Sequence, residues 1–517
     1  RRLDLLDAGG DPRTAVRAVF SWSCRHLDTV SAQAFRLAGL HPGPDFGPHA
    51  VAALTSATLQ DSRGVLDLLA RAHLIQQPRS GRYGMHDLLR AYARELAAAH
   101  DDQDGQHAAL TRLFDYYLHS AAAAMDTLHP AERHRRPRIP PASTPAPPVT
   151  GPAAARAWLD AERANLVAIT AHAAGHGWPA HATRLAATMY RYLDAGSYTQ
   201  EAIIIYTHAR AAARQTGDHA AEANTLMNVA GVYWQQSRYQ QAADHLQQAL
   251  ALSRQIGDRG CEAATLNSLG VLCVAQGRYQ EAHTLIAQAL DIYRQAGDLS
   301  GEMNCLINLG NAEERLGRYQ QAARHHYQSL SFARKADDRY VECTALINLG
   351  TVRMRQGDLR QADGYLGQAL ALCRETSNRY QQAQAEALTR TGDVRLRQGR
   401  PQEACDRLQE ALALYQEIGD RSGQADALNS LGEAHLAAGQ PGRARTHHAA
   451  ACEIATDIGD TYQQARAHAG LARAHHALAS PGQARDHWAK ALALYTRLGT
   501  PEADQVRTQL AEAYGRP

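Results

Sequence analysis

Cysteine and histidine, the residues most often used as metal ligands and nucleophiles, are numerous in this sequence but poorly spaced for chemistry. Its eight cysteines include no C-x-x-C pair, and most fall within helical repeats, so we interpret them as small core residues in a reducing cytoplasm. Adjacent histidines such as His325 and His326 would point about 100° apart on a helix and could not easily share one ion. The i,i+4 pair His172 and His176 runs into a predicted helix end at Gly175, so we expect no metal site.

Catalytic arrangements are equally weak. No Ser/His/Asp or Cys/His spacing stands out in the sequence. A nucleotide-binding P-loop needs Gly-Lys-Ser/Thr, because its lysine reaches the phosphates and its hydroxyl holds Mg²⁺. The chain has two lysines, and neither fits: Lys335 lies between Arg and Ala, and Lys490 lies between two alanines. We therefore expect neither enzyme activity nor a bound cofactor in this chain.

The bulk composition is that of a folded protein, since 45% of the 517 residues are hydrophobic and 21% are charged. A chain of this length predicts several domains or one extended array. The formal net charge of +2 gives no overall nucleic-acid signal, and no window approaches about 18 uncharged apolar residues, so we expect no membrane span. The chain starts RRLDLLDAGG, without an initiator Met or a signal peptide, which we interpret as the middle of a longer cytoplasmic protein.

From about residue 182 to the C-terminus, small residues recur with a period of 40, apart from one step of 42 between Gly350 and Gly392. One small position, in the first helix of each unit, is occupied by Ala230, Gly270, Gly310, Gly350, Gly392, Gly432 and Ala472. Two more recur in the second helix, beginning with Ala242 and Ala249. Helices need small side chains where their axes approach closely. The period therefore predicts a stack of helix-turn-helix units.

The turns support this prediction. The two helices of a unit are joined by Gly-Arg or Gly-Asp, as at Gly277 and Arg278, and the second helix ends at Gly-Asp, as at residues 257–258. These features resemble the tetratricopeptide (TPR) repeat in a longer form. The resemblance covers about 330 residues, from a degenerate unit at 182–218 to a last helix at 503–515 that would cap the stack. It implies an all-α fold, a TPR-type right-handed α-solenoid.

A solenoid of this kind has no enclosed active site and usually binds its partner in a concave groove lined by the first helices. The TPR pattern places groove-facing positions three before, one after, and four to five after the small position of the first helix. In this sequence they include Asn267, Asn311, Glu314, Arg315, Thr351, Arg355, Asp393, Arg397, Asn429, Glu433, Arg473 and His476. We expect a protein, a peptide or a small effector to bind there. The alternative is a solvated helix face that only keeps the protein soluble.

The first hundred residues predict a different and smaller domain. Helical patterns are found at 14–28, 31–42 and 62–77, and Ser31 is the expected N-cap of the second helix. A turn at 78–82 separates a strand-like segment from a closing helix within 83–100. Three helices, a small hairpin and a closing helix are typical of a winged-helix domain.

The segments VFSWSCRHLD and DLLARAHLI and the triplet Met85-His86-Asp87 resemble the end of an NB-ARC module, the nucleotide switch of STAND regulators. With AWLDAERANLVAI at 157–169 and the array behind it, the chain most resembles the AfsR-like NB-ARC–TPR regulators of antibiotic synthesis. In that family the histidine of the triplet lies beside the β-phosphate of ADP. The resemblance therefore implies that His86 helps to hold ADP, and that Asp87 organises the loop, but only in an intact module. ADP or ATP with Mg would belong to the full-length protein.

The resemblance also divides the chain. It implies a winged-helix end of an NB-ARC module at 1–100, a helical connector at 101–181 with a Pro-rich linker at 129–152, and the TPR array at 182–517. The implied function is that of the sensor and protein-interaction region of a nucleotide-switched transcriptional regulator. The winged helix would relay binding in the groove to an NB-ARC ATPase in cis, and DNA would be bound only through domains absent from this sequence.

Two alternatives remain open. The first is a stand-alone TPR scaffold that assembles other proteins. The second is a DNA-binding winged helix with a TPR oligomerisation tail. The second alternative has few basic residues to neutralise DNA phosphates. They are Arg79 and Arg82 on the wing and Arg63 and Arg71 on the preceding helix.

Overall fold

The computed structural model describes residues 20–130, 133, 136–196, 198–236, 238–375 and 381–514. The chain divides into two compact units, one from Arg1 to Val232 and one from Tyr233 to Pro517. This boundary falls inside the segment predicted as one TPR array and inside helix α10 (His219–Gln235). The predicted three-part division, with boundaries at residues 100 and 181, therefore stays a prediction.

The N-terminal part of unit 1 contains the elements expected for a winged helix. They are α2 (Thr29–Leu40), β1 (Asp45–Phe46), α3 (Pro48–Thr55), α4 (Leu59–Arg71), β2 (Gln76–Arg79), β3 (Arg82–Gly84) and α5 (Asp87–His100). The strands form an antiparallel sheet in the order β1-β3-β2, with Phe46 opposite Tyr83. Residues 20–25 are also helical, whereas residues 14–19 of the predicted first helix lie outside the described residues.

Helix α2 begins earlier than predicted, because its N-cap is Asp28 and not Ser31. The Asp28 carboxylate accepts hydrogen bonds from the backbone N–H of Ser31 at 2.8 Å and from its hydroxyl at 3.0 Å. A carboxylate at this position satisfies a free N–H and also interacts favourably with the positive end of the helix dipole. Helix α4 likewise begins at Leu59 instead of residue 62, with Thr58 as its N-cap.

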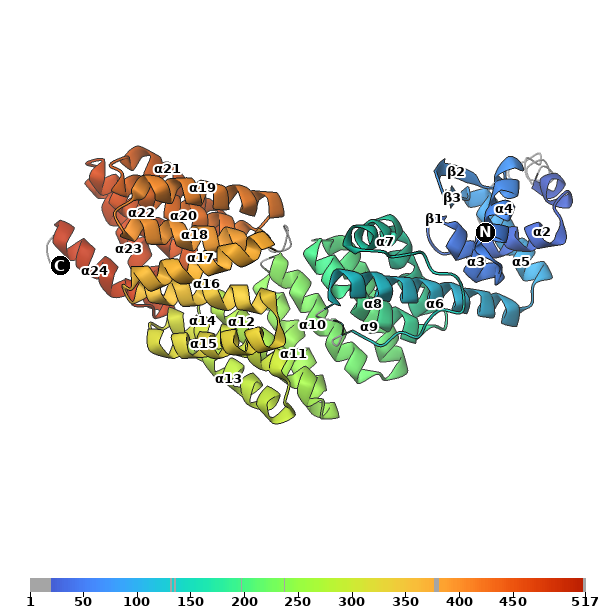
Figure 1. Cartoon of the computed structure of the whole chain (residues 1–517), viewed down its shortest axis with the longest axis horizontal. Coiled ribbons are helices and arrows are strands. Elements are labelled where there is room, and N and C mark those ends of the chain that lie inside the picture. The colour runs from blue at the N-terminus through green and yellow to red at the C-terminus, as the bar shows by residue number, and fades with distance from the viewer. Residues whose placement is uncertain are drawn as a thin grey trace. The chain divides into compact units, whose positions relative to one another are not determined.

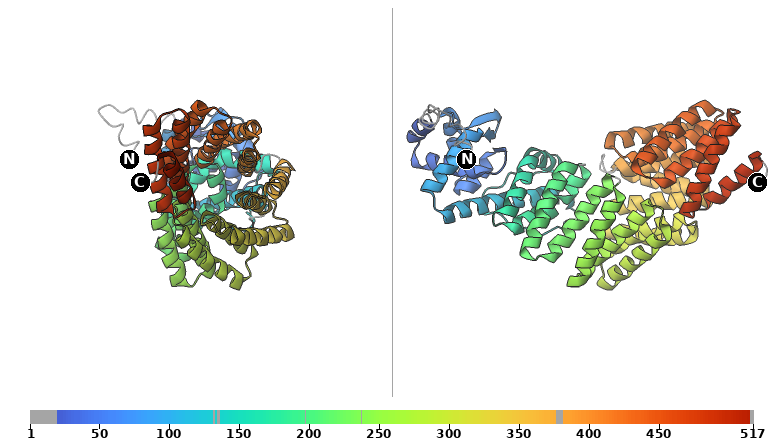
Figure 2. Two further views of the ribbon diagram at one scale, coloured as in Figure 1. Left: turned by 90° about the vertical axis from the view of Figure 1, so that its left-hand side faces the viewer. Right: turned by 180° about the vertical axis from the view of Figure 1, so that it is seen from behind.

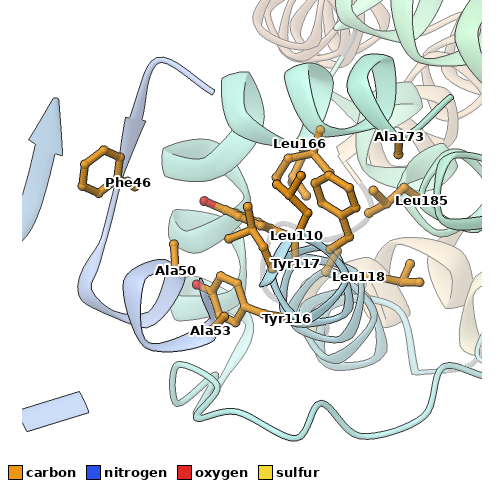
Figure 3. Packing of buried hydrophobic residues seen from close by; sticks show 14 of the residues in the cluster. Phe46, Ala50, Ala53, Leu110, Tyr116, Tyr117, Leu118, Leu166, Ala173 and Leu185 are labelled. Carbon is orange, nitrogen blue, oxygen red and sulfur yellow. The ribbon is translucent and has the colours of Figure 1, made fainter. Parts of the chain in front are cut away.

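Longer helices complete unit 1. They are α6 (Gln103–Leu128), α7 (Pro152–Gly175), α8 (Pro179–Ala195), α9 (Thr199–Thr216) and α10. One apolar core runs from the winged-helix elements to α9. Figure 3 shows part of it, where Tyr116 and Tyr117 of α6 lie among Ala50 and Ala53 of α3 and Leu166 of α7. The winged-helix elements and the connector helices therefore share one hydrophobic core.

Unit 2 is built from antiparallel helix pairs followed by one last helix, as Figure 1 and, from the opposite side, Figure 2 show. The helices are α11 (Tyr239–Ile256), α12 (Arg259–Ala275), α13 (Tyr279–Ala296), α14 (Leu299–Arg315), α15 (Tyr319–Ala336), α16 (Arg339–Arg355), α17 (Leu359–Glu375), α18 (Gln381–Arg397), α19 (Pro401–Ile418), α20 (Arg421–Ala437), α21 (Pro441–Ile458), α22 (Thr461–Ala477), α23 (Pro481–Leu498) and α24 (Glu502–Tyr514). The pairs α12/α13 to α22/α23 correspond to the predicted repeats. The predicted all-α TPR fold is confirmed.

A Gly-Asp dipeptide lies at four of the boundaries between successive pairs, whereas Asp337-Asp338 lies between α15 and α16. Gly297 ends α13 in the left-handed conformation (φ +67°), which glycine adopts without steric cost. Asp298 then caps α14, since its carboxylate accepts a 2.9 Å hydrogen bond from the backbone N–H of Gly301. The same arrangement occurs at residues 257–258, 419–420 and 459–460. The repeated dipeptide therefore ends one pair and starts the next.

The small position of each first helix faces a large side chain on the second helix. A Cβ added at Gly350 would lie 2.8 Å from Leu366 Cγ and 3.3 Å from the carbonyl oxygen of Ala362. At Gly310 the facing side chain is His326, which is fully buried, and burial lowers the pKa of this imidazole to about 3. Glycine at this position therefore sets how closely the two helices approach.

This packing predicts opposite effects for two glycine substitutions in one helix pair. Gly350→Ala should lower the thermal unfolding midpoint, because overpacking a filled core costs about 1–3 kcal/mol. Gly364→Ala is the matched control, since Gly364 lies in α17 with no atom within 4 Å of the added Cβ. It should raise the midpoint, because alanine stabilises a helix interior by about 1 kcal/mol relative to glycine. Circular dichroism melts would contradict the account if both substitutions shifted the midpoint in the same direction.

Candidate ligand-binding site

Early and late repeats of unit 2 touch each other. Leu498 at the end of α23 packs against Gly277 in the turn between α12 and α13, so closely that an added Cβ would collide with it. Tyr279 at the start of α13 lies in the same apolar cluster as Trp488 and Leu498 of α23. The small rotation between successive repeats has therefore accumulated until the array curls back on itself. One repeat does not reveal the curvature of a whole array, so this contact could not be predicted from the sequence, and the absence of an enclosed active site stays a prediction.

The concave face of unit 2 holds two cavities, of about 320 Å³ and about 170 Å³. Both are lined by Arg355, Arg390, Tyr462 and Arg466, so the cavities adjoin. The larger cavity is also lined by Met354, Asp393, Leu396, Arg397, Glu433, Ala469, Arg473, Tyr495, Glu502, Gln505, Val506 and Gln509. The smaller is also lined by Val274, Asn311, Glu314, Arg315, Asn348, Thr351, Glu386, Asp426 and Gln463.

Most of the predicted groove residues lie in these two walls. They are Asn311, Glu314, Arg315, Thr351, Arg355, Asp393, Arg397, Glu433 and Arg473. The structure thus brings together side chains from first helices that are far apart in the sequence. Whether they bind a ligand stays a prediction.

Three predicted groove residues lie elsewhere and contact neighbouring helices. The side-chain oxygen of Asn267 accepts a 3.1 Å hydrogen bond from the amide of Asn308. Asn429 is fully buried, and its amide donates to the backbone carbonyl of Gln463, in the first helix of the next repeat. The ring of His476 packs against Trp488, with 5.5 Å between the centroids. Asn267 and Asn429 thus link adjacent repeats, His476 links the two helices of one repeat, and none of the three lines the cavities.

Ion pairs cross the larger cavity and its border with the smaller one. Arg390 donates to Asp393 at 2.9 Å and also pairs with Asp426. Arg466 donates to Asp426 at 2.7 Å and to Glu433 at 2.9 Å. Burial would raise the pKa of the Glu433 carboxyl, but the Arg466 guanidinium outweighs burial and holds this pKa well below its usual range. The carboxylates and guanidinium groups therefore neutralise each other inside the array.

The last helix, α24, contributes a carboxylate to the larger cavity. The hydroxyl of Tyr462 donates a 2.8 Å hydrogen bond to Glu502 Oε1. Arg355 Nη1 lies 3.6 Å from the same oxygen, and Arg355 Nη2 donates to the Tyr462 hydroxyl at 3.3 Å. The Arg315 guanidinium lies over the Tyr462 ring, 4.1 Å from its centroid. Helix α24 therefore caps the stack, as predicted, and also takes part in the interior of the array.

Sequence reasoning missed Arg390, Asp426, Tyr462, Arg466 and Glu502. The first four lie two, six or ten residues before the small position of their own helix. One predicted groove position lies three residues before the small position. The residues six and ten before the small position lie on the same face of the helix, one and two turns nearer its start. Following the 3.6-residue period to the start of each helix would have found them. No repeat-based signal could have identified Glu502, which lies beyond the last repeat.

His86 is the N-cap of α5, and its Nδ1 accepts a 3.3 Å hydrogen bond from the backbone N–H of Leu88. His86 and Asp87 are both exposed at this helix start. A phosphate site would need further donors, and the only lysines of the chain, Lys335 and Lys490, lie in unit 2. The residues around His86 do not by themselves suit a nucleotide. A role for His86 and Asp87 in binding ADP within an intact module stays a prediction.

Arg82 of the wing turns inward, where it cannot contact DNA. Its side chain is 16% exposed and pairs with Asp45 of β1 and with Glu162 of α7. Glu162 also accepts a 2.6 Å hydrogen bond from the Asn165 amide and a 3.3 Å hydrogen bond from the Tyr117 hydroxyl of α6. This polar cluster joins the sheet to α6 and α7. One of the two wing arginines is therefore unavailable for phosphate neutralisation.

Neither a cluster of metal-ligating side chains nor a membrane-spanning helix is found in the part of the chain that the structure describes. No group of three or more His, Cys, Asp or Glu side chains there has an arrangement suited to a metal ion. Within those same ranges, no helix combines the length and the apolar character that are needed to span a bilayer.

Comparison with known proteins identifies the repeats. The family model described as tetratricopeptide repeat matches overlapping segments at 192–255, 223–295, 261–335, 302–375, 341–417 and 384–457. Together these segments cover just over half of the chain.

Two curated relatives are regulators. Over 257 residues the chain is 33% identical to "Regulatory protein AfsR" of Streptomyces griseus, an alignment that covers 48% of this chain and 25% of the relative. Over 180 residues it is 38% identical to "Regulatory protein AfsR" of Streptomyces coelicolor, covering 34% of this chain and 18% of the relative. The chain thus spans about a quarter or less of the length of these relatives. The resemblance to AfsR-like regulators that the sequence predicted is confirmed.

A solved structure shares the fold. It is a signal transduction ATPase with numerous domains (STAND) with a tetratricopeptide repeat sensor, from Pyrococcus horikoshii. The TM-score is 0.59 at 13% identity, and the match covers 98% of this chain and 69% of the other. At this identity the likeness concerns the fold alone.

The Arg82 cluster predicts a large loss of stability in unit 1 for one wing substitution and almost none for its neighbour. Arg82→Met leaves the buried Glu162 without its counter-charge, which typically costs about 3–5 kcal/mol. Arg79→Met is the control, because Arg79 is exposed and surface substitutions usually change stability by less than about 0.5 kcal/mol. Thermal melts should separate the two variants widely, and equal midpoints would contradict the assigned role of Arg82.

The depressed pKa of Glu433 predicts a pH-dependent contribution to the stability of unit 2. Because the folded-state pKa lies below the ordinary value of 4.5, this contribution is complete above about pH 4.5 and is lost as the pH falls further. Glu433→Gln should therefore lower the unfolding midpoint at pH 7, and the difference from the unsubstituted protein should shrink towards pH 3. Glu403→Gln is the control, since its pair with Arg400 is half exposed and should matter little at either pH. A constant difference between pH 7 and pH 3 would refute this account of Glu433.

Proposed function

The chain belongs to the tetratricopeptide repeat family, and on that basis we propose that it is the effector-sensing region of an AfsR-like STAND regulator. In this proposal an effector, either a peptide or a small molecule, binds in the two cavities of unit 2. The winged helix of unit 1 then passes this event to a nucleotide switch in the rest of a longer cytoplasmic protein. The similarity to two regulatory proteins supports the regulatory role.

The observation that carries the proposal is the charge inside the larger cavity. Five arginines line it together with Asp393, Glu433 and Glu502, and Asp426 and Glu314 of the adjoining wall pair with three of these arginines. A face that served only solubility would gain nothing from collecting charged side chains into a shared interior space, because removing charges from water is costly unless they are paired. A concave, charged interior built from many repeats is therefore better explained as a binding site.

Unit 1 has the rigidity that a relay requires. The cluster around Arg82 and Glu162 fixes the sheet to α6 and α7, and one apolar core extends to α9. A body of this kind transmits a displacement without deforming, because packed interiors are not easily compressed. The effector could shift the switch only by binding one of its states more tightly than the other.

The nucleotide belongs to the switch module in this proposal and not to this chain. ADP or ATP with Mg²⁺ would supply the phosphate charge that the module senses. His86 and Asp87 would border that site, since they are exposed at the start of α5. No step of the proposal depends on their contact with nucleotide.

The test uses the complete protein that carries this chain, with Arg397→Gln and Arg473→Gln introduced together. Both arginines line the larger cavity, and Arg397 is exposed within it. Removing their charges should weaken effector binding, and so change nucleotide turnover and target-gene transcription by several-fold. Circular dichroism melts would establish that the doubly substituted protein is folded.

The control is the pair Arg407→Gln and Arg485→Gln, two exposed arginines outside the cavities. It removes the same charge from the same unit and should leave both outputs unchanged. If the two double variants gave the same turnover and transcription as the unsubstituted protein, the sensing role would be rejected.

A further inference from the structure

The arginines of the larger cavity fall into two groups. Arg390 and Arg466 are held in close ion pairs with carboxylates, and each is at most 16% exposed. Arg397 and Arg473 are held less closely by carboxylates. Arg473 donates to the backbone carbonyl of Ala469 at 3.3 Å and lies 3.5 Å from Glu433, and among the described residues Arg397 has no ion-pair partner. Arg397 is therefore the arginine of this wall that lacks a carboxylate partner in the described part of the chain, and Arg473 is held less closely than Arg390 and Arg466.

A second observation also indicates a missing acceptor. The side-chain amide nitrogen of Asn348 is buried in the wall of the smaller, adjoining cavity and donates to no atom of the protein. Asn348 is 8% exposed. An amide donor that is buried without an acceptor costs about 1–3 kcal/mol. A ligand of the larger cavity would satisfy it only where its acceptor oxygens extended into the smaller one, and in the larger cavity itself Asp393 Oδ1 is buried without a donor.

The size of the site limits the ligand. A cavity of about 320 Å³ lies at the lower end of the range for small-molecule sites. It is too small for a helix of a partner protein, which is about 10 Å wide with its side chains. Carboxylates suit the site because the planar guanidinium fork matches a carboxylate with two parallel hydrogen bonds.

The protein itself places a carboxylate in this cavity. Glu502, the first residue of α24, accepts from the Tyr462 hydroxyl at 2.8 Å and lies 3.6 Å from Arg355. Helix α24 packs on α23 through apolar residues such as Val506, while Gln505 and Gln509 face the cavity. A ligand carboxylate that bound Arg355 and Tyr462 would have to replace Glu502.

We propose that the larger cavity binds a small organic anion with at least two carboxylates, and that Glu502 is an internal competitor for part of that site. Binding then displaces the start of α24 from Arg355 and Tyr462, so that the C-terminal helix reports occupancy of the cavity. This inference rests on the proposed function, because it names the chemical class of the effector and the element that moves.

The experiment uses the full chain and citrate as the probe, with isothermal titration calorimetry at pH 7.5 and constant ionic strength. Citrate should bind the unsubstituted protein. The Arg397→Gln/Arg473→Gln protein should bind it at least tenfold more weakly, and the Arg407→Gln/Arg485→Gln control should bind it normally. Glu502→Gln should bind it several-fold more tightly, because the internal competitor has lost its charge. Hydrogen exchange in residues 502–514 should become faster when citrate is added.

Three results would overturn the inference. The first is no citrate binding by either the unsubstituted protein or the Glu502→Gln protein. The second is inorganic phosphate binding as tightly as citrate with the same dependence on Arg397 and Arg473, which would overturn the assignment to carboxylates. The third is citrate binding whose affinity is unchanged by Glu502→Gln and which does not change hydrogen exchange in α24. That result would show that Glu502 does not compete with the ligand. Citrate binding without any effect on transcription in the complete protein would instead reject the proposed function and leave this inference standing.

Discussion

The contact between Leu498 and Gly277 determines how far the concave face of unit 2 is closed off from water. Gly277 ends the first helix of an early repeat with φ +75° and has no side chain, and Leu498 of the last repeat packs against it. If the two did not touch, the first helices would line an open channel filled with water. Their contact brings early and late first helices together around that face. Charged residues that this arrangement buries, such as Arg390 and Arg466, must then find partners within the protein or in a ligand.

The pairing inside unit 2 follows from this constraint. Asp426 lies between Arg390 and Arg466, and Arg466 also reaches Glu433. Such networks add little stability beyond that of an apolar core, because desolvation offsets most of the attraction between the charges. They do fix the relative positions of helices from different repeats. The arginines left outside the network are the ones that we expect to be available for a ligand.

Much of the fold could be predicted, because each repeat has its own local physics. The 40-residue spacing of small residues and the Gly-Asp boundaries follow from helix packing, capping and periodicity, which act over short stretches of sequence. The N-cap of α2 was misplaced because both Asp28 and Ser31 are good capping residues and only geometry distinguishes them. Nine of the predicted groove residues line the cavities, whereas Asn267, Asn429 and His476 do not, so the offsets that define a groove face hold in most but not all cases. The closure, the ion pairs and the contribution of Glu502 could not be predicted, because they depend on the summed rotation of many repeats.

The central claim, that unit 2 curls until its late repeats contact its early ones, has a direct test in the scarcity of lysine in this chain. Arg278→Lys and Arg497→Lys place amines beside Gly277 and Leu498, in a sequence that otherwise contains only Lys335 and Lys490. A short amine-reactive cross-linker followed by mass spectrometry of the monomer should then yield a cross-link between positions 278 and 497. Its absence, while both introduced lysines react singly with the reagent, would show that the array is open and contradict this account.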